Sequence, residues 1–308
     1  MNKYRITVII PVKNGAPKIE RCLETVYSQS LKPYEVIIVD GNSTDDTLQK
    51  AKKFPVTILY ENYHTRSGAC QTGIEHATGE YIAFTDADCY PDTEWLTTLV
   101  NTLDDSIAGV GGAIKNLGDN FWIHSVNLAY GTFLGSANSI QGGAIKGKGF
   151  VNSISGCNSL YRKRDLLKVG GFKHTLPGAE DADLNSRMLT VGKLLFVPSA
   201  IVFHDHGRGF KDFAKQMLRY GRDRGVARKL SLAVIPSILL LLLLISLFFT
   251  PWFFSAGVAV YLFLIFSMGL KFTLKENNLK YMGAIPLIYV VEHSLYSIGF
   301  WKGLILRR

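Results

Sequence analysis

Apolar runs and amphipathic segments alternate regularly over the first ninety residues of the chain. The apolar runs are short and rich in β-branched residues, which predicts buried strands. The segments between them have helical apolar spacing or begin with a Ser/Thr/Asp cap, which predicts helices. This alternation predicts an α/β fold, with a mostly parallel, Rossmann-like sheet and helices on both faces. The expected strands are 5–12, 34–40, 56–61 and 80–88, and the expected helices are 16–29, 43–54 and 66–79.

The middle of the chain has less regular patterns. Residues 107–116 predict another strand, 122–135 predict a helix, and 194–207 predict one or two late strands. Residues 139–156 are rich in glycine, serine and lysine, which predicts a loop.

Polar side chains follow the predicted strands at the points where these strands end. They are Asn14, Asp40, Glu61, Asp86 and Asp88. Ligands of open α/β sheets bind at the carboxyl ends of the strands, so we expect these groups to line one ligand-binding edge.

Asp86 and Asp88 stand one residue apart and repel each other unless a positive charge lies near them. A divalent cation with oxygen ligands would relieve that repulsion, and Mg²⁺ completes its shell with substrate phosphates. The pair therefore predicts a Mn²⁺ or Mg²⁺ site for a diphosphate, although a solvated strand terminus would look the same in sequence.

The C-terminal third is much more apolar than the rest. Residues 232–250 and 252–270 are each close to the roughly 20 residues that cross a bilayer, and a short turn joins them. Residues 281–301 are a third span or a re-entrant or interfacial helix, because Glu292 and His293 interrupt their apolar character.

The net charge of +9 is unevenly distributed. Between 207 and 230, eight lysines and arginines stand against two aspartates, beside the apolar segments. Nucleic-acid binding is one interpretation of this charge. The neighbouring membrane-length segment favours the other, an amphipathic basic helix on the cytoplasmic face of a membrane. We therefore expect an integral membrane protein with residues 1–206 facing the cytoplasm and no nucleic-acid partner.

The four cysteines are scattered, and no CxxC pair occurs among them. This spacing argues against a zinc site or a disulfide framework and is typical of a reducing compartment.

Five sequence blocks, in order, resemble family 2 inverting glycosyltransferases of the GT-A fold. They are ITVIIPVKNGAPKIERCLETVYSQ, EVIIVDGNSTDDT, GEYIAFTDADC, SGCNSLYRKRDLLKVGGF and EDADLNSRMLTVG. The resemblance covers roughly residues 5–206 and implies a catalytic domain 1–206. The basic and apolar patterns predict an interface helix over 207–230 and a membrane region over 231–308.

The resemblance implies a nucleotide-sugar site along the first strand ends. Asp40 is expected to bind the base, Asp88 the metal, and Asp86 the ribose or the metal. The full expected donor set is Pro11, Val12, Asn14, Asp40, Arg66, Gly68, Asp86 and Gln216. Gly156 and Asn158, in the fourth block, are expected on the acceptor side.

Glu180 and Asp181 begin a predicted helix, where acidic residues stabilise the helix dipole by about 0.3–1 kcal/mol. The resemblance gives them a catalytic role. Displacement at an anomeric carbon by a sugar hydroxyl needs a carboxylate that takes the hydroxyl proton. Asp181 is the expected base, and Glu180 is the second choice.

Gln216, Arg219 and Tyr220 resemble the Gln-x-x-Arg-Trp signature of membrane-bound polysaccharide synthases, with tyrosine in place of tryptophan. The resemblance places Gln216 and Arg219 at the diphosphate and Tyr220 at the acceptor sugar. The tyrosine argues against long processive synthesis. A basic helix resting on lipid headgroups is the alternative, and both roles can coexist.

His204 and His206 flank Asp205 after a predicted strand and form either a polar turn or part of a metal shell. His204 is the chosen candidate ligand.

The expected function is transfer of a sugar, most simply from a UDP-sugar with GDP as the alternative, to a hydroxyl of a lipid-linked or membrane-proximal saccharide. A polyprenyl-phosphate sugar synthase is the alternative enzyme. A catalytically inactive nucleotide-sugar-binding membrane protein is the remaining class, and the intact acidic pairs argue against it.

Overall fold

The computed structural model describes residues 4–118, 120–136, 147–174, 176, 178, 180–205, 209–227 and 234–306. The chain forms two compact units. The first comprises residues 1–117 and 145–206, and the second comprises 118–144 and 207–308. The segment 118–144 therefore differs from the sequence-based domain assignment, which placed it in the catalytic domain.

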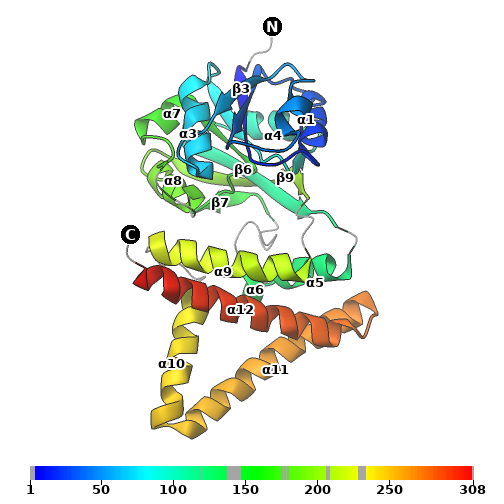
Figure 1. Cartoon of the computed structure of the whole chain (residues 1–308), viewed down its shortest axis with the longest axis vertical. Coiled ribbons are helices and arrows are strands. Elements are labelled where there is room, and N and C mark those ends of the chain that lie inside the picture. Colours follow the sequence, from blue (N-terminus) through cyan, green and yellow to red (C-terminus); the bar gives the residue numbers. More distant parts are fainter. Residues whose placement is uncertain are drawn as a thin grey trace. The chain divides into compact units, whose positions relative to one another are not determined.

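The described residues of the first unit form a nine-stranded sheet, and the predicted α/β class is confirmed (Figure 1). Its N-terminal half is parallel, in the order β3-β2-β1-β4. These strands are β1 (Ile6–Val12), β2 (Glu35–Asp40), β3 (Thr57–Tyr60) and β4 (Tyr81–Phe84). All seven residues of β1 are buried, as expected for a strand that helices cover on both faces.

The second half of the sheet is mixed. There β8 runs antiparallel to β4 and β6, and β5 and β7 run antiparallel to β9, whereas β6 and β9 are parallel. These strands are β5 (Cys89–Pro91), β6 (Ile107–Asn116), β7 (Gly149–Val151), β8 (Ser159–Arg162) and β9 (Lys193–His204). Of the loop predicted over 139–156, residues 139–146 lie outside the described part of the chain, and 149–151 form β7.

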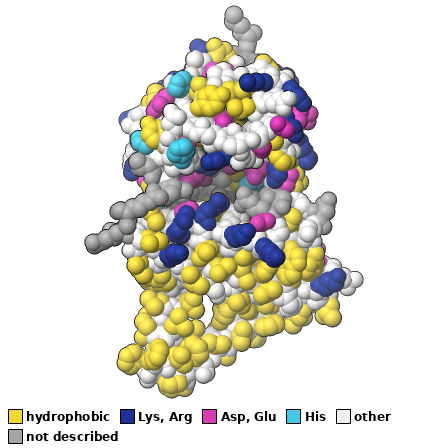
Figure 2. Space-filling model, viewed as in Figure 1, with side chains coloured by type: hydrophobic (Ala, Val, Ile, Leu, Met, Phe, Trp, Pro, Cys, Tyr) yellow, Lys and Arg dark blue, Asp and Glu magenta, His cyan; other side chains and the backbone are white. Residues whose placement is uncertain are grey.

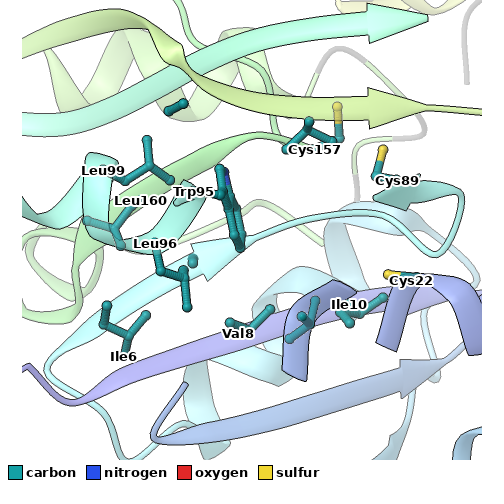
Figure 3. Close-up of a cluster of buried hydrophobic side chains, with 14 of the residues drawn as sticks. Ile6, Val8, Ile10, Cys22, Cys89, Trp95, Leu96, Leu99, Cys157 and Leu160 are labelled. Carbon is teal, nitrogen blue, oxygen red and sulfur yellow. The ribbon is translucent and has the colours of Figure 1, made fainter. Parts of the chain in front are cut away.

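The helices of the first unit are α1 (Ile19–Tyr27), α2 (Thr47–Ala51), α3 (Arg66–His76), α4 (Trp95–Asn101), α7 (Lys163–Lys168) and α8 (Glu180–Met188). The first three are the helices that the N-terminal pattern predicts. Trp95, Leu96 and Leu99 of α4 belong to the same buried cluster as Val8 and Ile10 of β1 (Figure 3). This apolar core fixes the strands whose ends carry the polar groups.

The second unit is helical. It consists of α5 (Phe121–Tyr130), α6 (Phe133–Ser136), α9 (Phe210–Ala227), α10 (Ile235–Phe249), α11 (Pro251–Glu276) and α12 (Tyr281–Ile305). Ala129 of α5 shares a buried cluster with Phe213 and Met217 of α9 and with Ile285 and Tyr289 of α12. This cluster is why 118–144 belongs to the second unit.

Helix α9 is amphipathic, as its sequence predicts. Phe213 and Met217 are buried, whereas Lys215, Arg219 and Tyr220 are exposed. Its described residues, 210–227, lie within the segment assigned from sequence to an interface helix.

Helices α9 and α12 pack with their main chains in direct contact. A side chain on Gly221 or Gly225 of α9 would collide with the carbonyl oxygens of Tyr296 or Phe300. Gly299 and Gly303 of α12 face the main chain of α9 in the same way. Each helix thus supplies glycines four residues apart, a spacing that lets helix backbones approach closely.

Helices α10 and α11 meet at Thr250 and form a V (Figure 1). Among the described residues, one helix, Pro251–Glu276, is long and apolar enough to cross a membrane. Helix α10 has 15 residues and a length of about 22 Å, short of the roughly 30 Å of a bilayer core. Most large exposed hydrophobic side chains of this unit lie on these two helices (Figure 2).

Substitution of Gly299 with leucine tests the contact between α9 and α12. The new side chain would collide with the α9 main chain, and overpacking of this kind costs about 1–3 kcal/mol. We expect a lower Tm for Gly299→Leu in thermal unfolding of the full chain. Gly283→Leu on the same helix is the control, because a Cβ at Gly283 would meet open space. Equal Tm values for the two variants would contradict the packing.

Candidate active site

Asp86 and Asp88 lie just beyond the sheet, in the link between β4 and β5. The predicted strand 80–88 ends earlier, at Phe84, and the turn is closed by a hydrogen bond from the Cys89 N–H to the Asp86 carbonyl (2.9 Å). Both carboxylates are half-buried, at the carboxyl end of β4. The sequence predicted both residues at this edge of the sheet. In the structure they lie in the loop between β4 and β5, not in the strand itself.

Arg66 supplies the positive charge beside Asp86. Its Nη2 lies 2.7 Å from Asp86 Oδ1, and its Nη1 lies 3.2 Å from Glu180 Oε1 and 3.5 Å from Asp181 Oδ1. Burial would lower the pKa of Arg66, but the attraction of Asp86 and the other acidic groups raises it above its ordinary value. One permanently charged guanidinium therefore joins the carboxylates beyond β4 to those of α8.

The start of α3 fixes the position of Arg66. Arg66 is the first residue of this helix, and the Thr65 side chain caps it by accepting a hydrogen bond from the Gly68 N–H (2.9 Å). Gly68 itself is buried, and a Cβ there would collide with the carboxylate of the buried Glu61. Gly68, predicted at the nucleotide, thus allows the helix to begin close to the end of β3.

Asp181 is held on both of its oxygens. Its Oδ2 accepts a hydrogen bond from the Gly156 N–H (2.8 Å), and its Oδ1 faces Arg66. A Cβ on Gly156 would collide with the Asp181 carboxylate and lie 2.9 Å from Arg66 Nη1. The pKa of Asp181 is raised to about 6, because the rise caused by burial and by the charge of Glu180 exceeds the lowering by Arg66. Such a carboxyl is ionised near neutral pH and basic enough to accept a proton.

Asp88 pairs with His204 rather than with Arg66. His204 Nε2 lies 3.3 Å from Asp88 Oδ1, and the Asp205 N–H donates to the Asp88 carbonyl (2.9 Å). Burial would lower the pKa of His204, but the hydrogen bond to Asp88 raises it overall. Asp205 itself accepts a hydrogen bond from the Tyr90 hydroxyl. His206 lies outside the described residues.

The donor atoms beside these strand ends suit a hard divalent cation. A carboxylate oxygen of Asp86 and one of Asp88 lie within 4.8 Å of each other. Asp88 also contacts His204, which offers an imidazole nitrogen. Carboxylate oxygens with one imidazole are ligands that Mn²⁺ accepts, so the residues present fit the predicted cation.

The ends of β1 and β2 are joined by a polar turn. Asn14 has a left-handed backbone (φ 53°), and its Oδ1 accepts a hydrogen bond from the Thr44 N–H (2.8 Å). Asp40 is 1% exposed, and both of its carboxylate oxygens accept hydrogen bonds from Ser43 (2.5 and 3.0 Å). Pro11 and Val12 are buried in β1. Ser43 was not predicted, although the Asn-Ser-Thr-Asp-Asp run after β2 is a recognisable turn signal.

Asn158 has a structural position, which corrects its assignment to the acceptor site. It is fully buried, its Oδ1 accepts from Trp95 Nε1 (2.8 Å), and its Nδ2 donates to the carbonyls of Ala113 and Ala200 (both 2.9 Å). Its amide therefore ties α4, β6 and β9 together. Gly156, two residues before it, lies at the carboxylate cluster instead.

Gln216, Arg219 and Tyr220 lie together on α9 in the second unit. Gln216 Nε2 donates to the Tyr220 hydroxyl (2.5 Å), and the Arg219 guanidinium lies 5.7 Å from the Tyr220 ring centre. Gln216 and Arg219 line a shallow depression with Asp212 and Lys215. The helical spacing of the motif places these groups on one exposed face.

Comparisons with known proteins agree with this architecture. The model of the family described as "Glycosyl transferase family 2" matches residues 7–170. The chain belongs to glycosyl transferase family 2. It is a glycosyltransferase with a GT-A fold, as five of its sequence blocks predict.

Curated relatives of the chain are named as glycosyltransferases. The chain is 26% identical, over 97% of both chains, to a Methanococcus voltae protein named dolichyl N-acetyl-alpha-D-glucosaminyl phosphate 3-beta-D-2,3-diacetamido-2,3-dideoxy-beta-D-glucuronosyltransferase. It is 30% identical to glycosyltransferase AglE of Haloferax volcanii, over 71% of this chain and 72% of that protein. Among solved structures, mannosyltransferase PcManGT from Pyrobaculum calidifontis, in complex with GDP-Man and Mn²⁺, matches with a TM-score of 0.63 at 20% identity. That match covers 99% of this chain and 88% of the other.

The pH dependence of transfer tests which carboxylate is the base. If Asp181 is the base, the rate falls as the pH drops through about 6, because protonated Asp181 cannot accept a proton. Glu180→Gln removes a neighbouring negative charge that raises the pKa of Asp181. We therefore expect this variant to keep most of its turnover at pH 8 and to shift the acidic limb of the pH–rate profile to lower pH. Loss of turnover in Glu180→Gln at every pH would assign the role to Glu180.

Gly156→Ala tests the close approach of Asp181 to the main chain. The methyl group would displace the Asp181 carboxylate and Arg66, so we expect kcat to fall at least about tenfold, since a general base contributes about 10²–10⁴-fold. Gly147→Ala is the matched control, because its Cβ would meet open space. Steady-state kinetics at saturating donor measures both, and unchanged kcat in Gly156→Ala would contradict the arrangement.

Proposed function

We propose that this enzyme is an inverting, metal-dependent glycosyltransferase of the cytoplasmic membrane. It transfers a sugar from a nucleotide diphosphate donor to a hydroxyl of a lipid-linked saccharide. The observation that carries this proposal is the geometry of Asp181. The half-buried carboxylate of Asp181 accepts a hydrogen bond from the Gly156 N–H and faces Arg66, and the same guanidinium pairs with Asp86 at the donor edge of the sheet.

The proposed step needs one base and one stabilised leaving group. The acceptor hydroxyl oxygen forms a bond to the anomeric carbon from the face opposite the diphosphate. The bond between that carbon and the diphosphate oxygen breaks, and the hydroxyl proton passes to Asp181. Arg66 keeps Asp181 ionised until the acceptor arrives, because its charge lowers the pKa that burial raises.

Asp88, Asp86 and His204 would hold the divalent cation. Bound there, Mn²⁺ or Mg²⁺ supplies positive charge to the departing diphosphate. The geometry supports this assignment through the proximity of Asp86 and Asp88 and the Asp88–His204 pair. Mn²⁺ in the PcManGT complex supports a divalent cation of this class.

A hydroxyl acceptor is favoured over a phosphate acceptor. A polyprenyl phosphate is already anionic and needs no base, whereas a sugar hydroxyl does. The pKa of Asp181, raised to about 6, suits a base that works near neutral pH. The name of the Methanococcus voltae relative describes transfer to a sugar on a dolichyl phosphate, which is an acceptor of the proposed kind.

The donor base is proposed as uracil, with guanine as the alternative. The base would lie near Asp40, Asn14 and the Ser43 turn, where the carboxyl ends of β1 and β2 meet. The GDP-mannose in PcManGT supports keeping GDP-sugars in the test.

The second unit is proposed as the membrane anchor. The apolar V of α10 and α11 would enter the bilayer, with both of its ends on the cytoplasmic side. Lys271, Lys275 and Lys280 are exposed at the α11 end and follow the expected positive-inside bias. The contact between α9 and α12 favours an interfacial α12 over a third span, because α9 is amphipathic and the two helices pack along each other. The proposed roles of Gln216 and Arg219 at the diphosphate and of Tyr220 at the acceptor are supported by the resemblance of their motif to the Gln-x-x-Arg-Trp signature.

A transfer assay on membranes tests this function. Membranes containing the full chain are supplied with labelled UDP- and GDP-sugars and Mn²⁺, and label in the lipid extract is measured. We expect transfer from one donor, its loss in excess EDTA, and a fall of about 10²–10⁴-fold in Asp181→Asn.

The same assay separates the alternatives. Near-normal turnover of Asp181→Asn would favour a polyprenyl-phosphate synthase. Undiminished transfer in EDTA would refute the requirement for a divalent cation. Donor binding without transfer to any acceptor would indicate an inactive binding protein.

A further inference from the structure

Three side chains of types that can bind a metal come from distant parts of the sequence and meet beside Asp88. Cys89 begins β5, Cys157 lies in the turn before β8, and His204 ends β9. One ligand atom from each lies within 4.8 Å of the other two. The sequence had argued against such a site, because the cysteines stand too far apart along the chain to form a recognisable metal-binding motif.

The fold holds this cluster in place through its backbone. Cys89 and His204 are register partners in the antiparallel pair β5–β9. Cys157 stands between Gly156, bonded to Asp181, and Asn158, whose amide is bonded to three elements of the core. Figure 3 shows Cys89 and Cys157 beside each other. The cluster is therefore assembled by sheet register and by a fixed turn.

Burial and chemistry both suit a thiophilic cation. Cys89 is 0% exposed, Cys157 is 5% exposed, and the His204 side chain is 14% exposed. Two cysteine sulfurs and one imidazole are common ligands of Zn²⁺, which takes Zn–S distances of about 2.3 Å and Zn–N distances of about 2.0–2.1 Å. Ligand atoms around such an ion lie roughly 3.3–3.8 Å apart, so a small inward movement of the side chains completes the site.

The other two cysteines show that burial alone does not create this arrangement. Cys22 and Cys70 are also fully buried, and neither belongs to a group of potential ligands among the described residues. Buried cysteines of that kind are ordinary small core residues. Cys89 and Cys157 differ because a histidine lies within reach of both.

We propose that Cys89, Cys157 and His204 form a second cation site, specific for Zn²⁺ or a similarly thiophilic divalent metal, and that its occupation inhibits the enzyme. On binding, the two thiols release their protons to solvent and the sulfurs coordinate the ion. His204 is then drawn from Asp88, which loses its partner for the catalytic cation. The inhibition rests on the proposed function, whereas the binding does not.

Binding is tested with Co²⁺ as a spectroscopic probe on the purified full chain, without donor or acceptor. We expect one equivalent to produce thiolate-to-cobalt absorption that Zn²⁺ displaces. Cys157→Ala should abolish this absorption and weaken Zn²⁺ binding at least about 100-fold, because loss of even an outer partner costs about 10–100-fold. Cys70→Ala is the matched control and should behave as the wild type. Cys157→Ser, of nearly native volume, gives the same expectation if the alanine variant fails to fold.

Inhibition is tested in the Mn²⁺-supported transfer assay. Added Zn²⁺ should inhibit the wild type and Cys70→Ala, and should inhibit Cys157→Ala far less, with basal Mn²⁺-dependent transfer retained. Absence of thiolate absorption in the wild type, or its persistence in Cys157→Ala, would overturn the site. Equal inhibition by Zn²⁺ of the wild type and Cys157→Ala would overturn its inhibitory role and leave the binding result to stand by itself.

Discussion

The first unit depends on the pairing of Arg66 with three carboxylates. Asp86, Glu180 and Asp181 come from segments that are far apart in sequence, and without a cation their mutual repulsion would oppose closure of this edge. The guanidinium is suited to this position because it is planar, always charged and able to bond in several directions at once. Gly156 completes the arrangement by leaving room for Asp181 against the main chain.

The carboxylates thus divide into two groups with different partners. Asp86, Glu180 and Asp181 share Arg66, whereas Asp88 pairs with His204. The two sequence neighbours Asp86 and Asp88 therefore experience different local charges, although both stand at the end of one strand. Separate neutralisation keeps Asp88 beside the imidazole of His204, and it keeps Asp86 on the same guanidinium as Asp181.

The sequence predicts the N-terminal half of the fold well because strand and helix alternate there with regular apolar patterns. It also places Asp86 and Asp88 at the ligand edge, since that edge follows from strand order. The bridging role of Arg66 could not be predicted, because it depends on the direction of α3 relative to α8.

Asn158 was predicted at the acceptor site, but it has a structural position. It lies two residues after Gly156 in sequence, but the turn before β8 places its amide in the core. The antiparallel β5–β9 pair, which brings Cys89 to His204, has no local signal, whereas the glycine spacing in α9 and α12 was present in the sequence.

Under the proposal that the second unit is the membrane anchor, the main-chain contact between α9 and α12 has a consequence for how the enzyme can adapt to different membranes. Gly225 and Gly299 hold together two helices between which the α10–α11 segment is inserted. An insertion with both ends fixed can change in length or apolarity without disturbing the two-helix frame. Matching a thicker or thinner bilayer therefore requires substitutions only within the inserted segment, because mismatch acts on the apolar length of a helix. The exposed face of α9, with Gln216, Arg219 and Tyr220, keeps its geometry while the hydrophobic thickness of the anchor varies.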